Sequence, residues 1–291
     1  MKLASFSDRQ GRRLGVVDGD QIIDLAVAAP QLPVDMTAFL AAGPEALAAA
    51  AQAKSSATGR IGLDKVRLEA PLPNPRKFLG LGLSFKTHVE EIRKSGMPIP
   101  LTPNQVWFNK QVTCIVGPTD PIHLPRVSSQ LDYEGEMAMV IGTRCRHVKA
   151  ADAHKVIAGF MVCNDVSVRD WQMRAPTAQL GKSFDTHGPT GPWLTTPDEA
   201  GDPGNLRIRT WVDDDLRQDG NTNDFVYTLG QMIEELTTVF TLEPGDILAT
   251  GTPSGIGAMM KPPNFLKAGQ RVKVEIENLG AINNLVIAEP V

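Results

Sequence analysis

The sequence predicts a mixed α/β fold that is built mainly from strands. Short apolar runs recur along the 291-residue chain, and its 26 glycines and 22 prolines punctuate them with turns. Helical patterns are fewer, and the main ones cover residues 36–53 and 229–238. The length allows one large domain or two, with an ample core.

The first elements are short strands followed by a helix. Strand candidates separated by Gly and Asp turns occupy residues 2–6, 13–17 and 21–25. The helical pattern at 36–53 follows them. Residues 71–75, with the sequence Pro-Leu-Pro-Asn-Pro, form the clearest linker in the chain.

After this linker the chain returns to strands. The strand-like segments that matter for the argument are 137–141, 160–163, 246–248, 272–277 and 284–288. The helix expected at 229–238 interrupts the series. No internal repeat and no low-complexity tract occurs.

Two acidic residues precede the apolar run 137–141 in the stretch Asp-Tyr-Glu-Gly-Glu. Strand side chains alternate faces, so Glu134 and Glu136 are expected to point the same way. Burying two adjacent carboxylates without a partner costs several kcal/mol, and a divalent cation would offset that cost. Oxygen ligands favour Mg²⁺, Mn²⁺ or Ca²⁺ over Zn²⁺. The alternative is an exposed edge strand whose acids are solvated or paired with arginine.

A third acid, Asp165, follows the apolar run 160–163. A ligand often occupies the end of a buried strand, but Asp is also favoured as a helix N-cap. If a helical turn begins near Asp165, Arg169 and Gln172 share its face. The three side chains would then suit an anionic, oxygen-rich ligand. A surface salt bridge between Arg169 and Asp165 is the alternative.

Two further segments are rich in small residues. The sequence Gly181-Lys182-Ser183 resembles the end of a phosphate-binding loop, but Pro176 stands where that motif requires glycine, so we reject it. A solvated lysine is then the usual outcome for Lys182. Residues 249–257 follow a strand and contain three glycines, which would let backbone N–H groups approach a ligand. A plain surface turn explains that segment nearly as well.

His88 and Glu91 are spaced to meet on one helix face. A carboxylate beside an imidazole raises its basicity and fixes its tautomer, as a general base requires. An amphipathic surface helix with unrelated polar residues is the alternative. Gly80 and Gly82 do not begin a dinucleotide-binding fingerprint, because the last position of that motif is Phe85.

Taken together, these segments resemble the fumarylacetoacetate hydrolase family, in its short-chain branch. Six stretches match in order over roughly residues 70 to 290, namely 82–91, 131–142, 164–172, 181–193, 218–221 and 242–257. The resemblance implies a β-roll core with a small N-terminal domain, usually assembled as a homodimer. With the linker as the boundary, the domains would be residues 1–70 and 71–291.

The resemblance also implies roles for the polar residues. Glu134, Glu136 and Asp165 would hold Mg²⁺ or Mn²⁺, with Ca²⁺ as a further option. Substrate would contact the set Arg169, Gln172, Lys182 and Thr252. His88 and Glu91 would form a general-base dyad on a lid segment, with Lys182 as the third catalytic residue. One departure is that Ser84-Phe85 replaces the Asn-Tyr that is usual before the lid.

Such a site favours chemistry on a 2-oxo or β-diketo acid. A divalent cation stabilises the enolate that forms when the C–C bond beside a carbonyl breaks. We therefore expect metal-dependent hydrolysis of an acylpyruvate or a related β-diketo acid. Loss of CO₂ from an oxaloacetate-type acid, or isomerisation of a dienedioate, reaches the same enolate, and the sequence does not separate these outcomes. A catalytically inactive protein that binds metal and a 2-oxo acid is the alternative from another class.

Whole-chain properties narrow the range of partners. The net charge of −4 and the lack of a basic cluster argue against a nucleic-acid surface. No apolar run is long enough to span a membrane, and the first ten residues lack a signal-peptide hydrophobic region. The three cysteines are odd in number and lie near apolar strands, which favours reduced thiols in a cytosolic protein.

Overall fold

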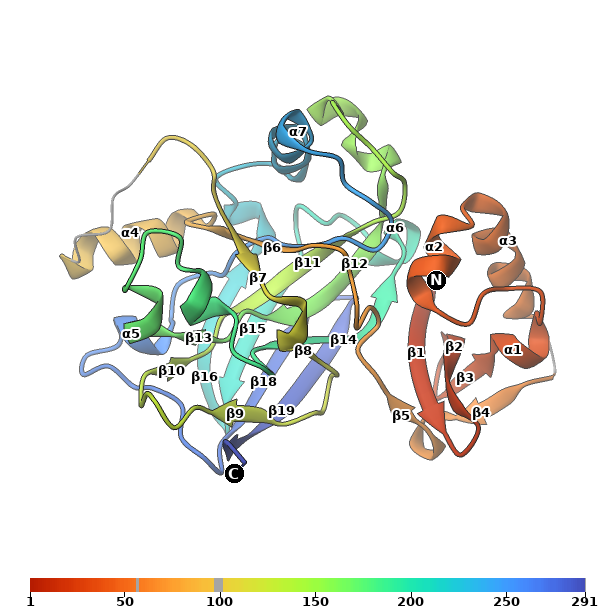
Figure 1. Ribbon diagram of the computed structural model, residues 1–291, viewed down its shortest axis with the longest axis horizontal. Helices are drawn as coiled ribbons and strands as arrows, with labels where there is room; N and C mark the ends of the chain where they lie inside the picture. Colours follow the sequence, from red (N-terminus) through yellow and green to blue (C-terminus); the bar gives the residue numbers. More distant parts are fainter. Residues whose placement is uncertain (56–57, 97–101, 291) are drawn as a thin grey trace.

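The computed structural model describes residues 1–55, 58–96 and 102–290. Figure 1 shows a fold in which strands outweigh helices, which confirms the predicted fold class. The N-terminal elements form a lobe at one side of the larger body, drawn in red and orange. None of the described helices has the length and apolar character needed to cross a membrane.

The N-terminal lobe is an antiparallel meander covered by short helices. Its strands are β1 (Lys2–Asp8), β2 (Gly11–Asp18), β3 (Gln21–Asp24) and β4 (Arg60–Gly62), and its helices are α1 (Leu25–Ala28), α2 (Met36–Ala41) and α3 (Pro44–Ala53). The single helix predicted for 36–53 is wrong, because Gly43 adopts a φ of +77° and Pro44 opens a new helix. The strand predicted to reach Leu25 ends one residue earlier, because the Asp24 side chain caps α1.

One long sheet runs through both parts of the molecule, and β1 of the lobe pairs with β14 of the body. The body strands in this sheet are, in spatial order, β14 (Gly188–Thr195), β12 (Ile157–Asn164), β11 (Gly135–Ile141), β17 (Ile247–Ala249), β6 (Phe78–Gly82) and β7 (Val106–Lys110). Two short strands pair at its side, β5 (Arg67–Leu68) with β1 and β8 (Ile115–Val116) with β14. The strand predicted at 246–248 is β17, which begins one residue later. Asp246 stands before it, and its carboxylate accepts hydrogen bonds from the backbone amides of Lys77 and Glu243.

A second sheet packs against the first. Its strands are β16 (Asp215–Asn221), β15 (Arg207–Val212), β18 (Arg271–Ile276), β19 (Gly280–Ala288) and β9 (Ile122–Leu124). Met137 and Met139 of β11 share one buried cluster with Val272 and Val274 of β18, so the main core lies between the two sheets. The strands predicted at 272–277 and 284–288 correspond to β18 and β19, and both of these strands begin earlier than predicted.

Helices and short turns complete the body. The longer helices are α4 (Lys86–Ser95) and α7 (Leu229–Val239), and the shorter ones are α5 (Arg169–Gln172) and α6 (Pro197–Ala200). Short 3₁₀ helices occur at η1 (Leu63–Lys65), η2 (Val112–Cys114), η3 (Ala150–Lys155), η4 (Gln179–Lys182), η5 (Thr222–Asp224) and η6 (Gly257–Met259). Strands β10 (Leu131–Asp132) and β13 (Ser167–Val168) form a separate antiparallel pair. The helix predicted at 229–238 is α7, which begins at a capping box formed by Thr228 and Gln231.

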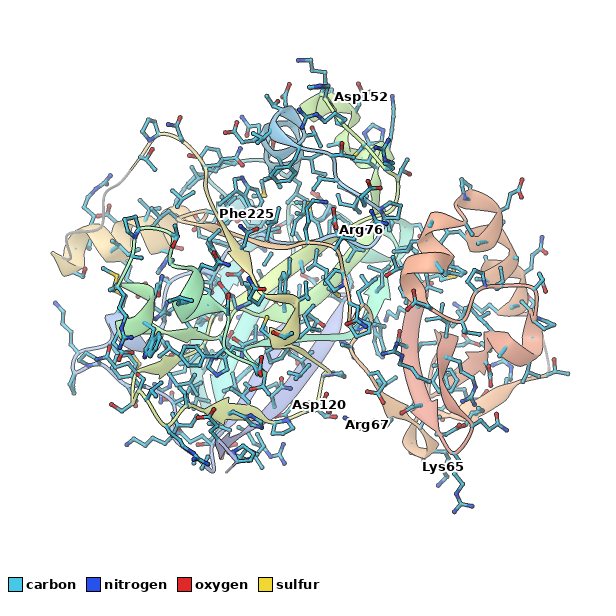
Figure 2. The ribbon with its side chains drawn as sticks, in the orientation of Figure 1. Lys65, Arg67, Arg76, Asp120, Asp152 and Phe225 are labelled. Atoms are coloured by element: carbon cyan, nitrogen blue, oxygen red, sulfur yellow. The ribbon has the colours of Figure 1, made fainter. Side chains whose placement is uncertain are left out.

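The predicted linker at 71–75 packs against the protein. Leu72 is fully buried, and the carbonyl of Pro71 accepts a hydrogen bond from Ser5. An ion pair of 2.5 Å between Arg67 and Asp120 joins the lobe to the body at the seam between them (Figure 2). The division into domains at residue 70 stays a prediction. All three cysteines are free and buried, as the sequence indicated.

Candidate active site and metal centre

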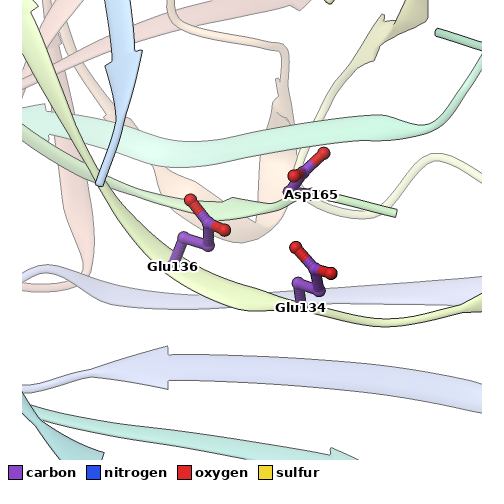
Figure 3. Close-up of side chains that lie close together, drawn as sticks. All are labelled: Glu134, Glu136 and Asp165. Atoms are coloured by element: carbon purple, nitrogen blue, oxygen red, sulfur yellow. The ribbon is translucent and has the colours of Figure 1, made fainter. Parts of the chain in front are cut away.

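Three carboxylates converge where two central strands of the long sheet meet. Glu134 lies just before β11, Glu136 is in β11, and Asp165 follows β12 directly. The antiparallel pairing of Gly135 with Asn164 brings these positions together. One ligand oxygen from each residue lies within 4.8 Å of the others. Figure 3 shows the three carboxylates facing a common space.

The three carboxylates are buried, with exposed fractions of 7% for Glu134, 1% for Glu136 and 0% for Asp165. The alternative of solvated acids on an exposed edge strand is therefore wrong. Pairing with arginine does occur at Glu134, since Arg169 donates to it. Glu136 has no such partner among the described residues, and its carboxylate accepts the backbone N–H of Gly251 at 2.8 Å.

Two buried lysines hold the carboxylates in place. The ammonium group of Lys182 lies 2.7 Å from an oxygen of Glu134 and 2.7 Å from an oxygen of Asp165. Lys110 donates to the other oxygen of Asp165 at 2.7 Å. Lys182 is 2% exposed, so the solvated outcome that is usual for such a lysine does not apply. Lys182 thus bridges two of the predicted metal ligands.

Charge is unevenly shared among the three carboxylates. Burial alone would raise the pKa of Glu134, but the charges of Lys182 and Arg169 hold that pKa well below its usual range. Burial raises the pKa of Glu136 well above its usual range, and the neighbouring Asp165 and Glu134 raise it further. Glu136 is therefore the carboxylate whose negative charge is least compensated by the protein.

The residues present fit a hard divalent cation. The cluster contains the four carboxylates of Asp132, Glu134, Glu136 and Asp165 but only the three cations Lys110, Arg169 and Lys182. It therefore carries one excess negative charge when all are ionised. A divalent cation beside Glu136 would reverse that imbalance, and carboxylate oxygens are the ligands that Mg²⁺, Mn²⁺ and Ca²⁺ take. No other group of this kind occurs among the described residues.

The helix expected near Asp165 begins later than predicted. Residues 167–168 form β13 against β10, so α5 starts at Arg169. Arg169 nevertheless reaches Gln172, because its Nη1 donates to the amide oxygen at 2.9 Å. Its other bonds go to Glu134 and Asp132, which rules out the alternative of a surface pair between Arg169 and Asp165.

Thr252 supports the strand that carries Glu136. Its hydroxyl donates to the carbonyl of Gly135 at 2.9 Å and accepts from the Gln218 side chain at 2.7 Å. Gly251 adopts a φ of +93°, and an added Cβ there would collide with Ser84, so this turn requires glycine. Residues 249–253 are buried, so the alternative of a plain surface turn is wrong for this part of the loop.

His88 and Glu91 form the predicted pair on helix α4. The Nδ1 of His88 lies 2.9 Å from one oxygen of Glu91, and the other oxygen accepts the backbone N–H of Gly255 at 2.9 Å. The polar residues of this helix are thus connected to the loop that supports Glu136. A cavity of about 650 Å³ opens between α4 and η6, and Glu91 forms part of its wall.

Sequence reasoning did not assign roles to four residues of this site, which are Lys110, Asp132, Asn164 and Gln218. Asn164 and Gln218 accept the backbone N–H groups of Glu134 and Gly135, respectively. Asp132 begins the acidic motif and could have been found from it, whereas the role of Lys110 follows from its contact with Asp165 and had no local sequence signal. The replacement Ser84-Phe85 lies in the interior, where Phe85 packs on Phe225 with ring centroids 4.7 Å apart (Figure 2).

Comparison with known proteins gives consistent matches. The model of the fumarylacetoacetate (FAA) hydrolase C-terminal domain matches residues 77–287. Oxaloacetate tautomerase fahd2, mitochondrial, of Xenopus laevis is 43% identical over 293 residues, which covers 99% of this chain and 90% of that protein.

Two solved structures extend the similarity to the whole fold. Fumarylacetoacetate hydrolase (EaFAH) from psychrophilic Exiguobacterium antarcticum is 34% identical, with a TM-score of 0.86 over 99% of this chain and 100% of that one. Maleylpyruvate hydrolase from Sphingobium sp. SYK-6, in complex with manganese(II) ion and pyruvate, is 33% identical, with a TM-score of 0.82 over 100% of both chains. The chain therefore belongs to the fumarylacetoacetate hydrolase family, and the relatives named above are enzymes.

Proposed function

We propose that this protein is a divalent-metal-dependent enzyme that interconverts the enol and keto forms of oxaloacetate. The observation that carries the proposal is the buried cluster of Glu134, Glu136 and Asp165, with Lys182 and Arg169 bonded to its oxygens. The choice of reaction is supported by the 43% identity with a protein named as an oxaloacetate tautomerase.

Charge favours a small acidic substrate at this site. The cluster with a divalent cation carries one excess positive charge, and oxaloacetate at neutral pH carries two negative charges. The guanidinium of Arg169 keeps its Nη2 without a hydrogen-bond partner among the described residues, so this end of it can donate to a substrate carboxylate. It is held by Asp132 and Glu134, so its orientation is set before the substrate arrives.

A bound Mg²⁺ or Mn²⁺ would polarise the 2-oxo group and make the neighbouring C–H more acidic. His88 is the candidate that removes a proton from C3 in the keto-to-enol direction, and the substrate oxygen then takes a proton from water. In the reverse direction the enol oxygen releases its proton to water and His88 returns one to C3. Glu91 holds Nδ1 and leaves Nε2 for this transfer. Lys182 places positive charge beside the carboxylates, where it would stabilise negative charge that develops on the substrate oxygen.

Hydrolysis of an acylpyruvate C–C bond, as expected from the sequence, is the second candidate. The same His88–Glu91 pair would serve to activate water, and the similarity to maleylpyruvate hydrolase supports this alternative. Both reactions need the same 2-oxo acid end of the substrate. They differ in whether a C–C bond is cut.

The test is a direct comparison of the reactions in one preparation. The decay of oxaloacetate enol absorbance is followed by stopped flow with Mg²⁺, Mn²⁺ or EDTA, while pyruvate release reports decarboxylation and acylpyruvate cleavage reports hydrolysis. We expect enol decay to be accelerated only with metal, to be lost in Glu134→Ala, and to be kept in Glu45→Ala, whose side chain is exposed on α3. Acceleration that survives EDTA and Glu134→Ala would contradict the proposal, and acylpyruvate cleavage without enol decay would favour the hydrolase.

A further inference from the structure

Asp132 is a fully buried carboxylate whose two oxygens are both engaged. Oδ1 accepts the backbone N–H of Gly257 at 2.9 Å and that of Tyr133 at 3.0 Å. Oδ2 accepts the backbone N–H of Ala258 at 2.9 Å and the Nε of Arg169 at 2.8 Å. One side chain therefore binds both the arginine of the candidate site and the start of η6.

The two ends of this connection lead to different parts of the site. On one side, Arg169 continues to Glu134 and Gln172. On the other side, η6 follows the loop in which the amide of Gly255 donates to Glu91 at 2.9 Å, and Glu91 holds His88. Tyr133, the neighbour of Asp132, donates its hydroxyl to the carbonyl of Gly255 at 2.9 Å. The segment from 255 to 258 is thus fixed by two adjacent residues of one chain segment.

We infer that Asp132 is a positioning residue that couples the anion-binding Arg169 to the His88–Glu91 pair. This inference rests on the roles proposed above for those three residues. The contact between Asp132 and Gly257 is tightly packed, because a Cβ added to Gly257 would lie 2.6 Å from Asp132 Oδ1 and 2.4 Å from the carbonyl oxygen of Asn264. A movement of Asp132 with Arg169 would therefore displace the loop that holds Glu91.

Asparagine has the shape of aspartate but cannot replace it here. Its amide offers one accepting oxygen and two N–H donors, whereas the neighbours of Asp132 are all donors. In either orientation of the substituted amide, one of its N–H groups faces a donor, so the link to Arg169 or to Gly257 is broken. Loss of such a supporting contact typically lowers activity about 10–100-fold.

The first arm of the test measures the link without metal or substrate. Amide hydrogen exchange of residues 255–260 is compared in metal-free wild type, Asp132→Asn and Asp170→Asn. Asp170 is the matched control, because it neighbours Arg169 but, among the described residues, binds only the Ser128 hydroxyl, from which asparagine also accepts. We expect faster exchange in Asp132→Asn alone, and unchanged exchange there overturns the inference whatever the wild-type activity proves to be.

The second arm separates the two ends of the link by kinetics and binding. Gly257→Ala pushes the loop away from Asp132 while leaving the bond between Asp132 and Arg169. This variant should have a kcat about tenfold or more below that of the wild type. Its affinity for oxalate, measured by calorimetry with Mn²⁺, should stay within about threefold of the wild-type value. Asp132→Asn should reduce both. A Gly257→Ala variant with unchanged kcat overturns the inference.

The third arm is a double-mutant cycle with His88→Ala. If Asp132 acts through the base, Asp132→Asn should lower kcat little further once His88 is absent, while still weakening oxalate. If the fold-losses of kcat caused by Asp132→Asn and by His88→Ala multiply in the double variant, the two residues act independently, and the proposed coupling between Asp132 and His88 is overturned. Absence of metal-dependent activity in the wild type would instead count against the proposed function, and the exchange arm alone would then decide the inference.

Discussion

Replacing Lys182 by methionine separates the contribution of the ammonium group from that of the metal. In the metal-free protein this group is bonded to Glu134 and Asp165 at 2.7 Å each, and it is 2% exposed. Methionine keeps an unbranched apolar stem but removes the charge. Glu134 and Asp165 then face Glu136 with one cation fewer, in a site where burial prevents water from compensating.

The expected size of the effect follows from this geometry. Breaking a buried ion pair by removing one partner costs about 3–5 kcal/mol, because the remaining charge is left buried. We therefore expect Lys182→Met to lower the free energy of unfolding by about that amount in EDTA. A divalent cation at the triad restores positive charge beside the same oxygens. Saturating Mn²⁺ should therefore stabilise the variant more than the wild type, by about 1.4 kcal/mol for each tenfold gain in metal affinity.

The assay is urea unfolding of both proteins in EDTA and in Mn²⁺. Lys155→Met is the matched control, since Lys155 also lies 2.6 Å from an aspartate, Asp152, but is 65% exposed (Figure 2). Exposed pairs are worth about 1 kcal/mol or less, so this control should change little in either condition. An equal gain from Mn²⁺ in the wild type and in Lys182→Met would refute the reasoning that Lys182 and the metal share these carboxylates.

Two further predictions concern other parts of the molecule. Burial lowers the pKa of His187 to about 3, so the folded state resists the protonation that the unfolded chain accepts below its usual pKa of about 6.5. The stabilising contribution of neutral His187 is present above pH 6.5 and is lost as the pH falls toward 3, by up to about 1.4 kcal/mol per pH unit. His187→Gln should make the free energy of unfolding, measured with urea between pH 7 and pH 4, fall less steeply with pH. An equal pH dependence in both proteins would contradict the lowered pKa of His187. Oxalate should compete with substrate in the presence of Mg²⁺, and Arg169→Lys should weaken it about tenfold or more, because a point charge does not replace a planar fork. Equal inhibition constants would remove Arg169 from the substrate site.

The fold was predictable where the local pattern dominates. The apolar periodicity of residues 229–238 predicted α7, and the structure adds the capping box that starts it. The glycine and proline at 43–44 end one helix and begin another, which the prediction of a single helix over 36–53 overlooked. The start of α5 was not predictable from Asp165, because it depends on the pairing of Ser167 with Asp132, far away in the chain.

The candidate site divides in the same way. Spacing along one element identified the His88–Glu91 pair, and the acidic motif identified Glu134 and Glu136. Lys110 escaped notice because its importance comes from a contact with Asp165 across 55 positions, which no local pattern reveals. The homodimer, the cytosolic location and the roles assigned to the site residues stay predictions.

The proposed chemistry depends on Glu134, Glu136 and Asp165 binding one divalent cation together. Titration calorimetry of Mn²⁺ into the wild type, Glu134→Ala, Asp165→Ala and the exposed control Glu45→Ala measures this binding without any assumption about the substrate. We expect one site per chain in the wild type and the control, and at least a tenfold loss of affinity in each triad variant, because removing one of three anionic ligands weakens binding steeply. Unchanged Mn²⁺ affinity in folded Glu134→Ala and Asp165→Ala would show that the three carboxylates do not form a metal site.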